Sequence, residues 1–93
     1  MILPVHYDSL APHEKRPVRE EYVRLQGGKC SHCGALLTGA PAEKITKLWI
    51  NRKLFPEGFF RWPVHLHHDH NTGMTLGAVH NTCNAVLWQY NGE

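Results

Sequence analysis

The clearest pattern of hydrophobic and polar positions lies in the last third of the chain. The segment VHLHH is short and follows a proline, DHNTG contains turn-forming residues, and MTLGAV can return as a second strand. In the next segment, HNTCNAVLWQY, a helix that starts near Asn81 would have Val86, Leu87 and Tyr90 as its apolar anchors. The pattern therefore predicts strand, turn, strand and helix, in that order, over residues 63–90.

A helical pattern also appears near the N-terminus, in RPVREEYVRLQGG. It predicts a helix over residues 15–28, in which Val18, Tyr22 and Leu25 fall on one stripe and a glycine pair ends the helix. Residues 1–14 contain prolines and show little periodicity, which predicts an extended arm.

Length and composition limit the class of protein. A chain of 93 residues forms one small domain, 1–93, and an apolar fraction of 42% suffices for a compact core. No apolar run approaches the roughly 20 residues that span a bilayer, and the first residues do not resemble a signal peptide. We therefore expect a soluble, cytoplasmic protein without a membrane partner. The net charge is only +2, so charge alone does not separate a nucleic-acid surface from an ordinary solvated one.

The three cysteines are an odd number, which suits a metal site better than a set of disulfides. Cys30-x2-Cys33 and His80-x2-Cys83 are two pairs with the same spacing, and together they offer the ligands of a tetrahedral Cys3His zinc site. The ion would clamp two distant segments of a small domain. The alternative is buried free cysteines with a surface histidine. His32, between the two thiols, is interpreted as a surface side chain.

Half of the eight histidines lie in the segment HLHHDH. Side chains alternate between the two faces of a strand, so His65 and His67 are predicted on one side and Leu66, His68 and His70 on the other. Divergent neighbours are poorly placed to chelate one ion together. They could instead hold a metal on one side of a phosphodiester while the other imidazole activates water, as in-line displacement at phosphorus requires.

Three motifs, GGKCSHCG, LHHDHNTG and GAVHNTCNAVLW, carry a resemblance to a known family. The chain resembles the HNH endonucleases, and most closely the zinc-stapled branch that includes phage Holliday-junction resolvases and small phage and bacterial HNH nucleases. The resemblance covers Gly27–Tyr90, whereas residues 1–26 and 36–61 match no named pattern. It implies a small α+β fold with an N-terminal helix, in which residues 63–90 form the ββα-metal (His-Me finger) motif. A structural Cys3His zinc site would stabilise this motif.

The resemblance also implies roles for individual residues. His67 and Asn84 correspond to the ligands of a catalytic Mg²⁺ or Mn²⁺, His68 to the general base that activates water, and His70 to a residue that assists at the phosphate. The implied activity is hydrolysis of DNA phosphodiester bonds, by nicking or double-strand cleavage. An unperturbed imidazole has a pKa of about 6.5, so His68 can be a neutral base near neutral pH.

Some positions depart from the family pattern or have a simpler interpretation. The middle asparagine of the motif has two candidates, Asn71 and Asn81, and His80 replaces a thiolate that is usual at the zinc. Asp69 is most simply a turn residue that caps backbone amides. His65 could orient the site, but an exposed position on the strand is the simpler interpretation.

A different class of function is also compatible with the motifs, namely a non-catalytic zinc module that binds nucleic acid or protein. Neither H-E-x-x-H nor the zinc-deaminase signature occurs, which excludes those zinc enzymes. The expected partner of a nuclease is DNA, and a homodimer is one way to supply the two sites that double-strand cutting needs. The basic residues expected to contact phosphate are Lys44, Lys47, Arg52, Lys53 and Arg61.

Overall fold

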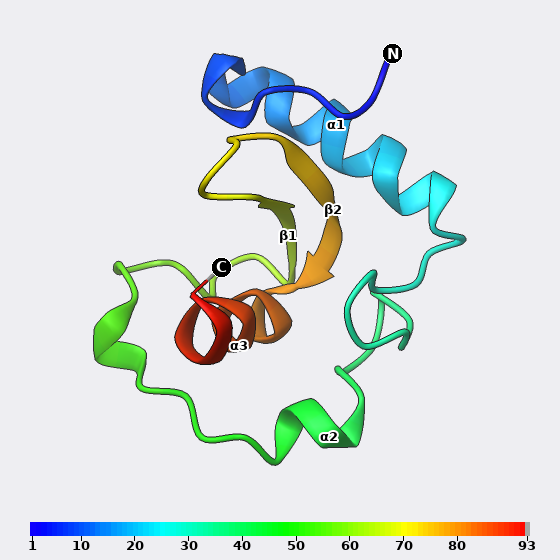
Figure 1. The fold of residues 1–93 in the computed structure, drawn as a ribbon. Coiled ribbons are helices and arrows are strands. Elements are labelled where there is room, and N and C mark those ends of the chain that lie inside the picture. The colour runs from blue at the N-terminus through cyan, green and yellow to red at the C-terminus, as the bar shows by residue number, and fades with distance from the viewer. Residues whose placement is uncertain (93) are drawn as a thin grey trace.

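The computed structural model describes residues 1–92 and has a small α+β fold, as predicted. A two-stranded antiparallel hairpin lies at its centre, with one long helix along it and another at its end (Figure 1). The elements are α1 (Pro12–Leu25), α2 (Glu43–Thr46), β1 (Val64–His68), β2 (Thr75–His80) and α3 (Asn81–Asn91), with 3-10 turns at Tyr7–Ser9 and Arg52–Leu54. The predicted order of strand, turn, strand and helix is confirmed.

The register of the hairpin changes near the end of β1. From Val64 to His67 each residue pairs regularly, with His67 opposite Gly77, but His68 lies opposite Thr75. Leu76 is therefore an extra residue on β2, which is the arrangement of a β-bulge. The pairing of β1 is therefore regular through His67 and changes only at His68, the last residue of the strand.

The helix α1 begins and ends earlier than the predicted range 15–28. It starts at Pro12, where the missing amide hydrogen of proline costs nothing, and the Glu14 side chain accepts a hydrogen bond from the Ala11 amide at 2.8 Å. This cap lies within the segment predicted to be extended. The helix ends at Leu25, before two glycines with left-handed backbone angles.

The N-terminal segment folds back on the hairpin and is not the extended arm predicted for residues 1–14. The Val5 amide donates to Thr75 Oγ1 at 3.0 Å, and the Thr75 amide donates to the Val5 carbonyl at 2.9 Å. The Tyr7 amide donates to the Gly73 carbonyl at 2.8 Å. These bonds attach the arm to the turn between the strands, and they could not be read from local periodicity.

Polar side chains fix α1 to β2. The Tyr22 hydroxyl lies 2.8 Å from Thr75 Oγ1 in a hydrogen bond. Gln26 accepts a hydrogen bond from the Ala78 amide at 2.8 Å and donates one to the Ala78 carbonyl at 2.9 Å. Its side chain thus satisfies both backbone groups of Ala78 on the outer edge of β2. A Cβ on Gly77 would lie 2.8 Å from Gln26 Oε1, which explains why the strand has glycine at this position.

The core connects the hairpin, α3 and the long segment between α1 and β1. That segment passes around the molecule through α2 before it reaches β1 (Figure 1). Ile45 of α2 is buried in the core, whereas Trp49 is 69% exposed. Within residues 1–92, no helix is both long and apolar enough to cross a membrane. The buried cluster consists of Cys30, Leu37, Ile45, Ala78, Val79, Cys83 and Val86.

Candidate functional site

The two predicted ligand pairs come together in the fold. The ligand atoms of Cys30, Cys33, His80 and Cys83 all lie within 4.8 Å of one another. His80 Nδ1 is 3.5 Å from Cys33 Sγ and 3.7 Å from Cys83 Sγ. The four side chains thus form a Cys3His group that could hold a metal ion, as the spacing predicted.

The surroundings of His80 select the nitrogen that faces the thiols. Its Nε2 lies 2.9 Å from the Leu36 carbonyl and 3.1 Å from the Gly39 carbonyl. Because a carbonyl oxygen can only accept, Nε2 carries the hydrogen and donates it, and Nδ1 has its lone pair free. Metal-binding histidines commonly donate their second nitrogen to a carbonyl or carboxylate in this way.

The thiols are too close together to be ionised independently. A hydrogen bond from the Cys83 thiol lowers the pKa of the Cys30 thiol to about 3. The same hydrogen bond, with burial and the charge of Cys30, raises the pKa of the Cys83 thiol far above its usual value. A divalent cation would remove this conflict, because it stabilises all the thiolates at once. Three thiolates and one imidazole are the ligands of a closed zinc site.

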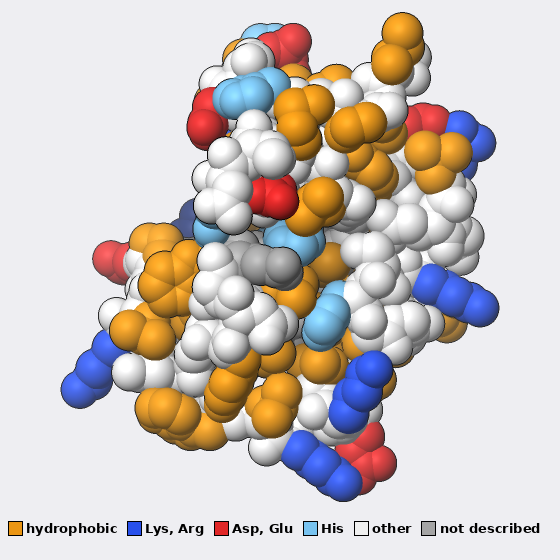
Figure 2. Space-filling view, in the orientation of Figure 1, with side chains coloured by type: hydrophobic (Ala, Val, Ile, Leu, Met, Phe, Trp, Pro, Cys, Tyr) orange, Lys and Arg blue, Asp and Glu red, His pale blue; other side chains and the backbone are white. Residues whose placement is uncertain are grey.

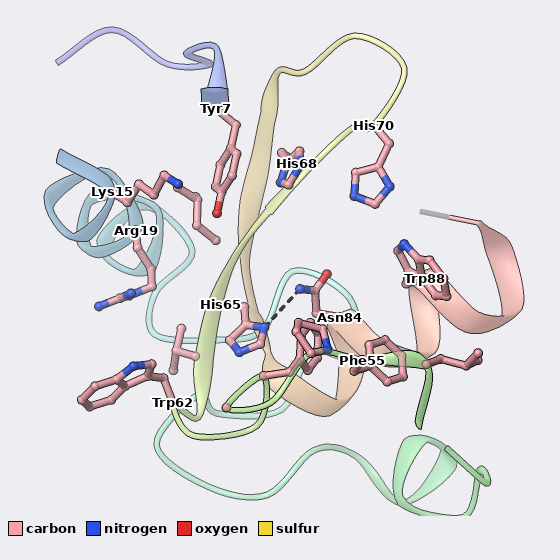
Figure 3. Close-up of a pocket in the computed structure, with 16 residues that line it drawn as sticks. Tyr7, Lys15, Arg19, Phe55, Trp62, His65, His68, His70, Asn84 and Trp88 are labelled. Carbon is pink, nitrogen blue, oxygen red and sulfur yellow. Dashed lines mark hydrogen bonds between the residues drawn. The ribbon is translucent and has the colours of Figure 1, made fainter. Parts of the chain in front are cut away.

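A separate cavity of about 520 Å³ lies between α1, the hairpin, α3 and the segment before β1 (Figure 3). It brings together three of the residues to which the resemblance assigns a role, namely His68, His70 and Asn84. His65 also lines it, near the base of α3. The Cys3His group and this cavity are adjacent in the sequence, because Cys83 of the group is followed directly by Asn84 of the cavity.

His68 is held between two aromatic rings. Its ring stacks on Tyr7, with centroids 3.9 Å apart and an interplanar angle of 7°, and the His70 ring lies 4.8 Å away. Burial lowers the pKa of the His68 imidazole, and the charges of His70 and Lys15 act in the same direction, while Asp8 opposes them. The imidazole is therefore neutral at neutral pH and has a lone pair that can accept a proton.

Asn84 on α3 is oriented by a histidine of β1. Its Nδ2 lies 3.1 Å from His65 Nδ1, and because the amide group is the donor, the carboxamide oxygen stays free. That oxygen points toward the part of the cavity that His68 and His70 line (Figure 3). Burial lowers the pKa of His65, which keeps its ring neutral and Nδ1 able to accept. The exposed position favoured for His65 from the sequence is therefore wrong.

His67 has a different environment from the one predicted. The residue is 7% exposed, and it is not among the residues that line the cavity. His65 and His68, which strict alternation places on opposite faces, line the same cavity. Leu66, His68 and His70, which were predicted on one side, all line the cavity, and His65 lines it as well although its pairing with Val79 is regular. Binding of one ion by His67 together with Asn84 stays a prediction.

Two residues near the histidines have structural roles. Asp69 Oδ1 accepts from the amides of Asn71 at 2.7 Å and of the residue after it at 3.1 Å. This confirms Asp69 as a turn-capping residue. Asn81 Nδ2 donates to the carbonyls of Phe60 at 3.1 Å and Trp62 at 3.0 Å. Asn81 thus attaches the segment before β1 to the start of α3.

The basic residues that line the cavity are not the predicted ones. Lys15 and Arg19 of α1 line it, four residues apart on one helix face. Their spacing was visible in the sequence, but nothing there showed that α1 lies against β1. Lys and Arg side chains lie mostly around the edge of the face in Figure 2, with histidines nearer its middle. The predicted phosphate contacts are exposed and lie outside the cavity lining; they are Lys44, Lys47, Arg52, Lys53 and Arg61.

No protein-family model, no curated protein and no solved structure matches this chain. What the site can do therefore follows from its own geometry and chemistry, together with the motifs.

Proposed function

We propose that the protein is a metal-dependent endonuclease of the HNH type, which hydrolyses phosphodiester bonds of DNA. One observation carries the proposal. A half-buried neutral imidazole (His68), a second imidazole (His70) and a helix carboxamide (Asn84) line one cavity on a strand, turn, strand and helix unit. The order of elements in this unit agrees with the ββα-metal motif that the resemblance implies, and residue types suited to that motif lie at the end of the first strand and on the helix.

The Cys3His group holds Zn²⁺ in this proposal and has a structural role. Its ligands join the segment after α1 to the junction of β2 and α3. These four ligands would occupy all four coordination positions of a tetrahedral zinc ion, so no open coordination position is left for a substrate. The chemistry therefore belongs to the cavity beside it.

His68 is the general base. Its neutral ring accepts a proton from a water molecule, whose oxygen attacks the phosphorus as the bond to the 3′ oxygen breaks. Tyr7 keeps the ring in one orientation by stacking on it. His70, beside His68, contacts a non-bridging oxygen of the phosphate. The departing 3′ oxygen takes a proton from water and His68 returns its own proton to solvent, so the products are a 5′ phosphate and a 3′ hydroxyl.

Asn84 offers an oxygen ligand for Mg²⁺ or Mn²⁺, which prefer oxygen donors and keep several waters. The resemblance assigns His67 as the second ligand, and this assignment is part of the proposal. When bound, such an ion supplies positive charge to the phosphate and to the departing 3′ oxygen. This fits a cavity in which imidazoles and a carboxamide surround the reaction centre and the fixed cations lie at one edge.

Supercoiled plasmid tests the proposed activity directly. We expect the zinc-loaded protein to nick the plasmid when Mg²⁺ or Mn²⁺ is added, and to leave it intact when no divalent ion is added. Gel electrophoresis of the relaxed form measures the rate. If no divalent ion supports cleavage of duplex, branched or single-stranded DNA, the non-catalytic zinc module is the correct function.

The contact between His65 and Asn84 yields a separate prediction. His65→Leu removes the hydrogen-bond acceptor for Asn84 Nδ2. The carboxamide is then free to rotate, and its oxygen is no longer held pointing into the cavity. Losing such an orienting partner typically costs about 10- to 100-fold in metal affinity or activity. We expect the Mg²⁺ concentration for half-maximal cleavage to rise by about this factor.

His65→Gln is the matched variant, because its side-chain oxygen can still accept from Asn84. We expect it to restore much of the Mg²⁺ dependence, whereas a purely packing role for the His65 ring would leave both variants equally impaired. Equal Mg²⁺ dependence of His65→Leu and the parent protein would contradict a positioning role for His65.

A further inference from the structure

Lys15 and Arg19 differ from the other cations of α1 in their surroundings. The three ion pairs within residues 1–92 use Arg16, Arg24 and Lys47, whose side chains are largely exposed. Lys15 and Arg19 belong to none of these pairs, are half-buried, and line the cavity. Lys15 Nζ lies 4.3 Å from the centre of the Tyr7 ring, so it is held beside the ring that stacks on His68. Two cations without a carboxylate partner thus face the cavity from one edge.

Aromatic rings form much of the remaining wall. Phe55 lies 4.7 Å from Phe59 and 5.6 Å from Trp88 between ring centres, in tilted and edge-to-face arrangements. Trp88 is 43% exposed and Trp62 is 66% exposed, so both keep ring surface that the protein does not cover. Figure 3 shows Phe55 and Trp88 on the opposite side of the cavity from Lys15 and Arg19. Trp62 lies on the same side as Arg19 in that view, so the cavity has a cationic edge with Trp62 beside it and an aromatic wall with Phe55 and Trp88 opposite.

We infer that this cavity seats one unstacked nucleotide of a DNA strand, with a phosphate at Lys15 and Arg19 and the base against the aromatic rings. The inference rests on the proposed function and names its substrate class. Proteins that bind single strands combine a basic track for the backbone with aromatic rings on which bases stack. A volume of about 520 Å³ lies within the range of about 300–1,000 Å³ for small-ligand sites and is suited to one nucleotide.

A base can enter the cavity only after it has left the stack of its neighbours. In a continuous duplex the base must give up both its pairing and its stacking, whereas in a single strand it has no partner to lose. The preferred substrate is therefore single-stranded DNA, or DNA with an unpaired nucleotide beside the bond to be cut. A regular duplex binds less tightly because its bases stay outside the aromatic wall.

Binding without catalysis tests the cationic edge. The zinc-loaded protein is titrated into a fluorescent single-stranded oligonucleotide, and into the same sequence as a duplex, without Mg²⁺ or Mn²⁺. We expect tighter binding to the single strand. In Lys15→Ala/Arg19→Ala, two phosphate contacts are lost, so the slope of log affinity against log salt should become shallower by about 1.4. Arg16→Ala is the matched control on the same helix and should keep the parent slope.

Tryptophan emission tests the aromatic wall. The protein has three tryptophans, of which Trp62 and Trp88 line the cavity and Trp49 does not. We expect single-stranded DNA to quench the emission of Trp49→Phe, which keeps both cavity rings, and not that of Trp62→Phe/Trp88→Phe. An oligonucleotide with abasic sites should bind through its phosphates but quench neither protein. Trp62→Ala/Trp88→Ala should lower single-strand affinity about tenfold or more, since stacking on such rings is lost.

The inference is overturned if the duplex binds as tightly as the single strand, if Lys15→Ala/Arg19→Ala has the salt slope of Arg16→Ala, or if quenching persists in Trp62→Phe/Trp88→Phe. These measurements use no catalytic ion, so they stand even if no divalent ion supports cleavage. Conversely, if nicking depends on His68 but the protein does not prefer single-stranded DNA, the proposed nuclease activity stands and only the proposed nucleotide-binding role of the cavity is wrong.

Discussion

Replacement of His68 by alanine is expected to lower the rate of Mg²⁺-dependent DNA cleavage by about 10²- to 10⁴-fold, the usual contribution of a general base. The imidazole is neutral, lines the cavity and stacks on the Tyr7 ring, so its removal takes away the proposed base. Initial rates of plasmid nicking measure the effect. Zinc content and circular dichroism should match those of the parent protein, because His68 lies outside both the core cluster and the Cys3His group.

Two further histidine variants make this result specific. His13 is exposed on α1, and His13→Ala should leave the rate unchanged. His70→Ala should lower the rate less than His68→Ala, since in the proposed mechanism His70 contacts the phosphate and His68 takes the proton. Added imidazole should restore part of the activity of His68→Ala by entering the space beside Tyr7. If His68→Ala cuts as fast as the parent protein, the assignment of the base is wrong.

Loss of the structural ion is expected to unfold the protein. Structural zinc sites bind with an apparent free energy of about 10–16 kcal/mol, which equals or exceeds the total stability of about 5–15 kcal/mol typical of small domains. Cys30→Ser removes a buried ligand, so we expect the zinc content to fall from about one ion per chain and the cooperative thermal transition to disappear. Prolonged chelation of the parent protein should have the same result. Circular dichroism and metal analysis measure both effects.

His32→Ala is the matched control for the Cys3His group, because His32 lies between Cys30 and Cys33 in the sequence but its side chain is exposed. It should keep the zinc and the thermal transition of the parent protein. A Cys30→Ser protein that keeps its zinc and unfolds at the parent temperature would show that the Cys3His group does not stabilise the fold.

The sequence alone predicted the features that depend on residue type and short spacing. The two ligand pairs were recognised because few residue types bind zinc and because their spacing is fixed. The hairpin and α3 were recognised because turn residues separate two short strands from a helical stripe. The turn role of Asp69 followed in the same way, since its side chain bonds to amides only two and three residues ahead.

The features that were missed depend on contacts between distant segments. The place of His65 in the cavity lining depends on its contacts with Phe59, 4.7 Å away between ring centres, and with Asn84. The hydrogen bond from Asn84 to His65 and the stack of Tyr7 on His68 join residues far apart in the chain. Lys15 and Arg19 became candidates only when α1 was seen to line the cavity. The start of α1 at Pro12 had a local signal, because Glu14 lies three residues after Ala11, the residue just before the helix, which is the spacing of a capping glutamate.

One peptide bond separates a ligand of the Cys3His group, Cys83, from the carboxamide of Asn84. With an ion bound at the Cys3His group, the first turn of α3 would follow the length of the metal–sulfur bonds, and the cavity would respond to the size of an ion that it does not contain. Cadmium forms longer bonds to sulfur than zinc does. Exchanging one for the other would displace the Asn84 oxygen slightly relative to the imidazoles, and would adjust the geometry of the cavity without the substitution of any amino acid.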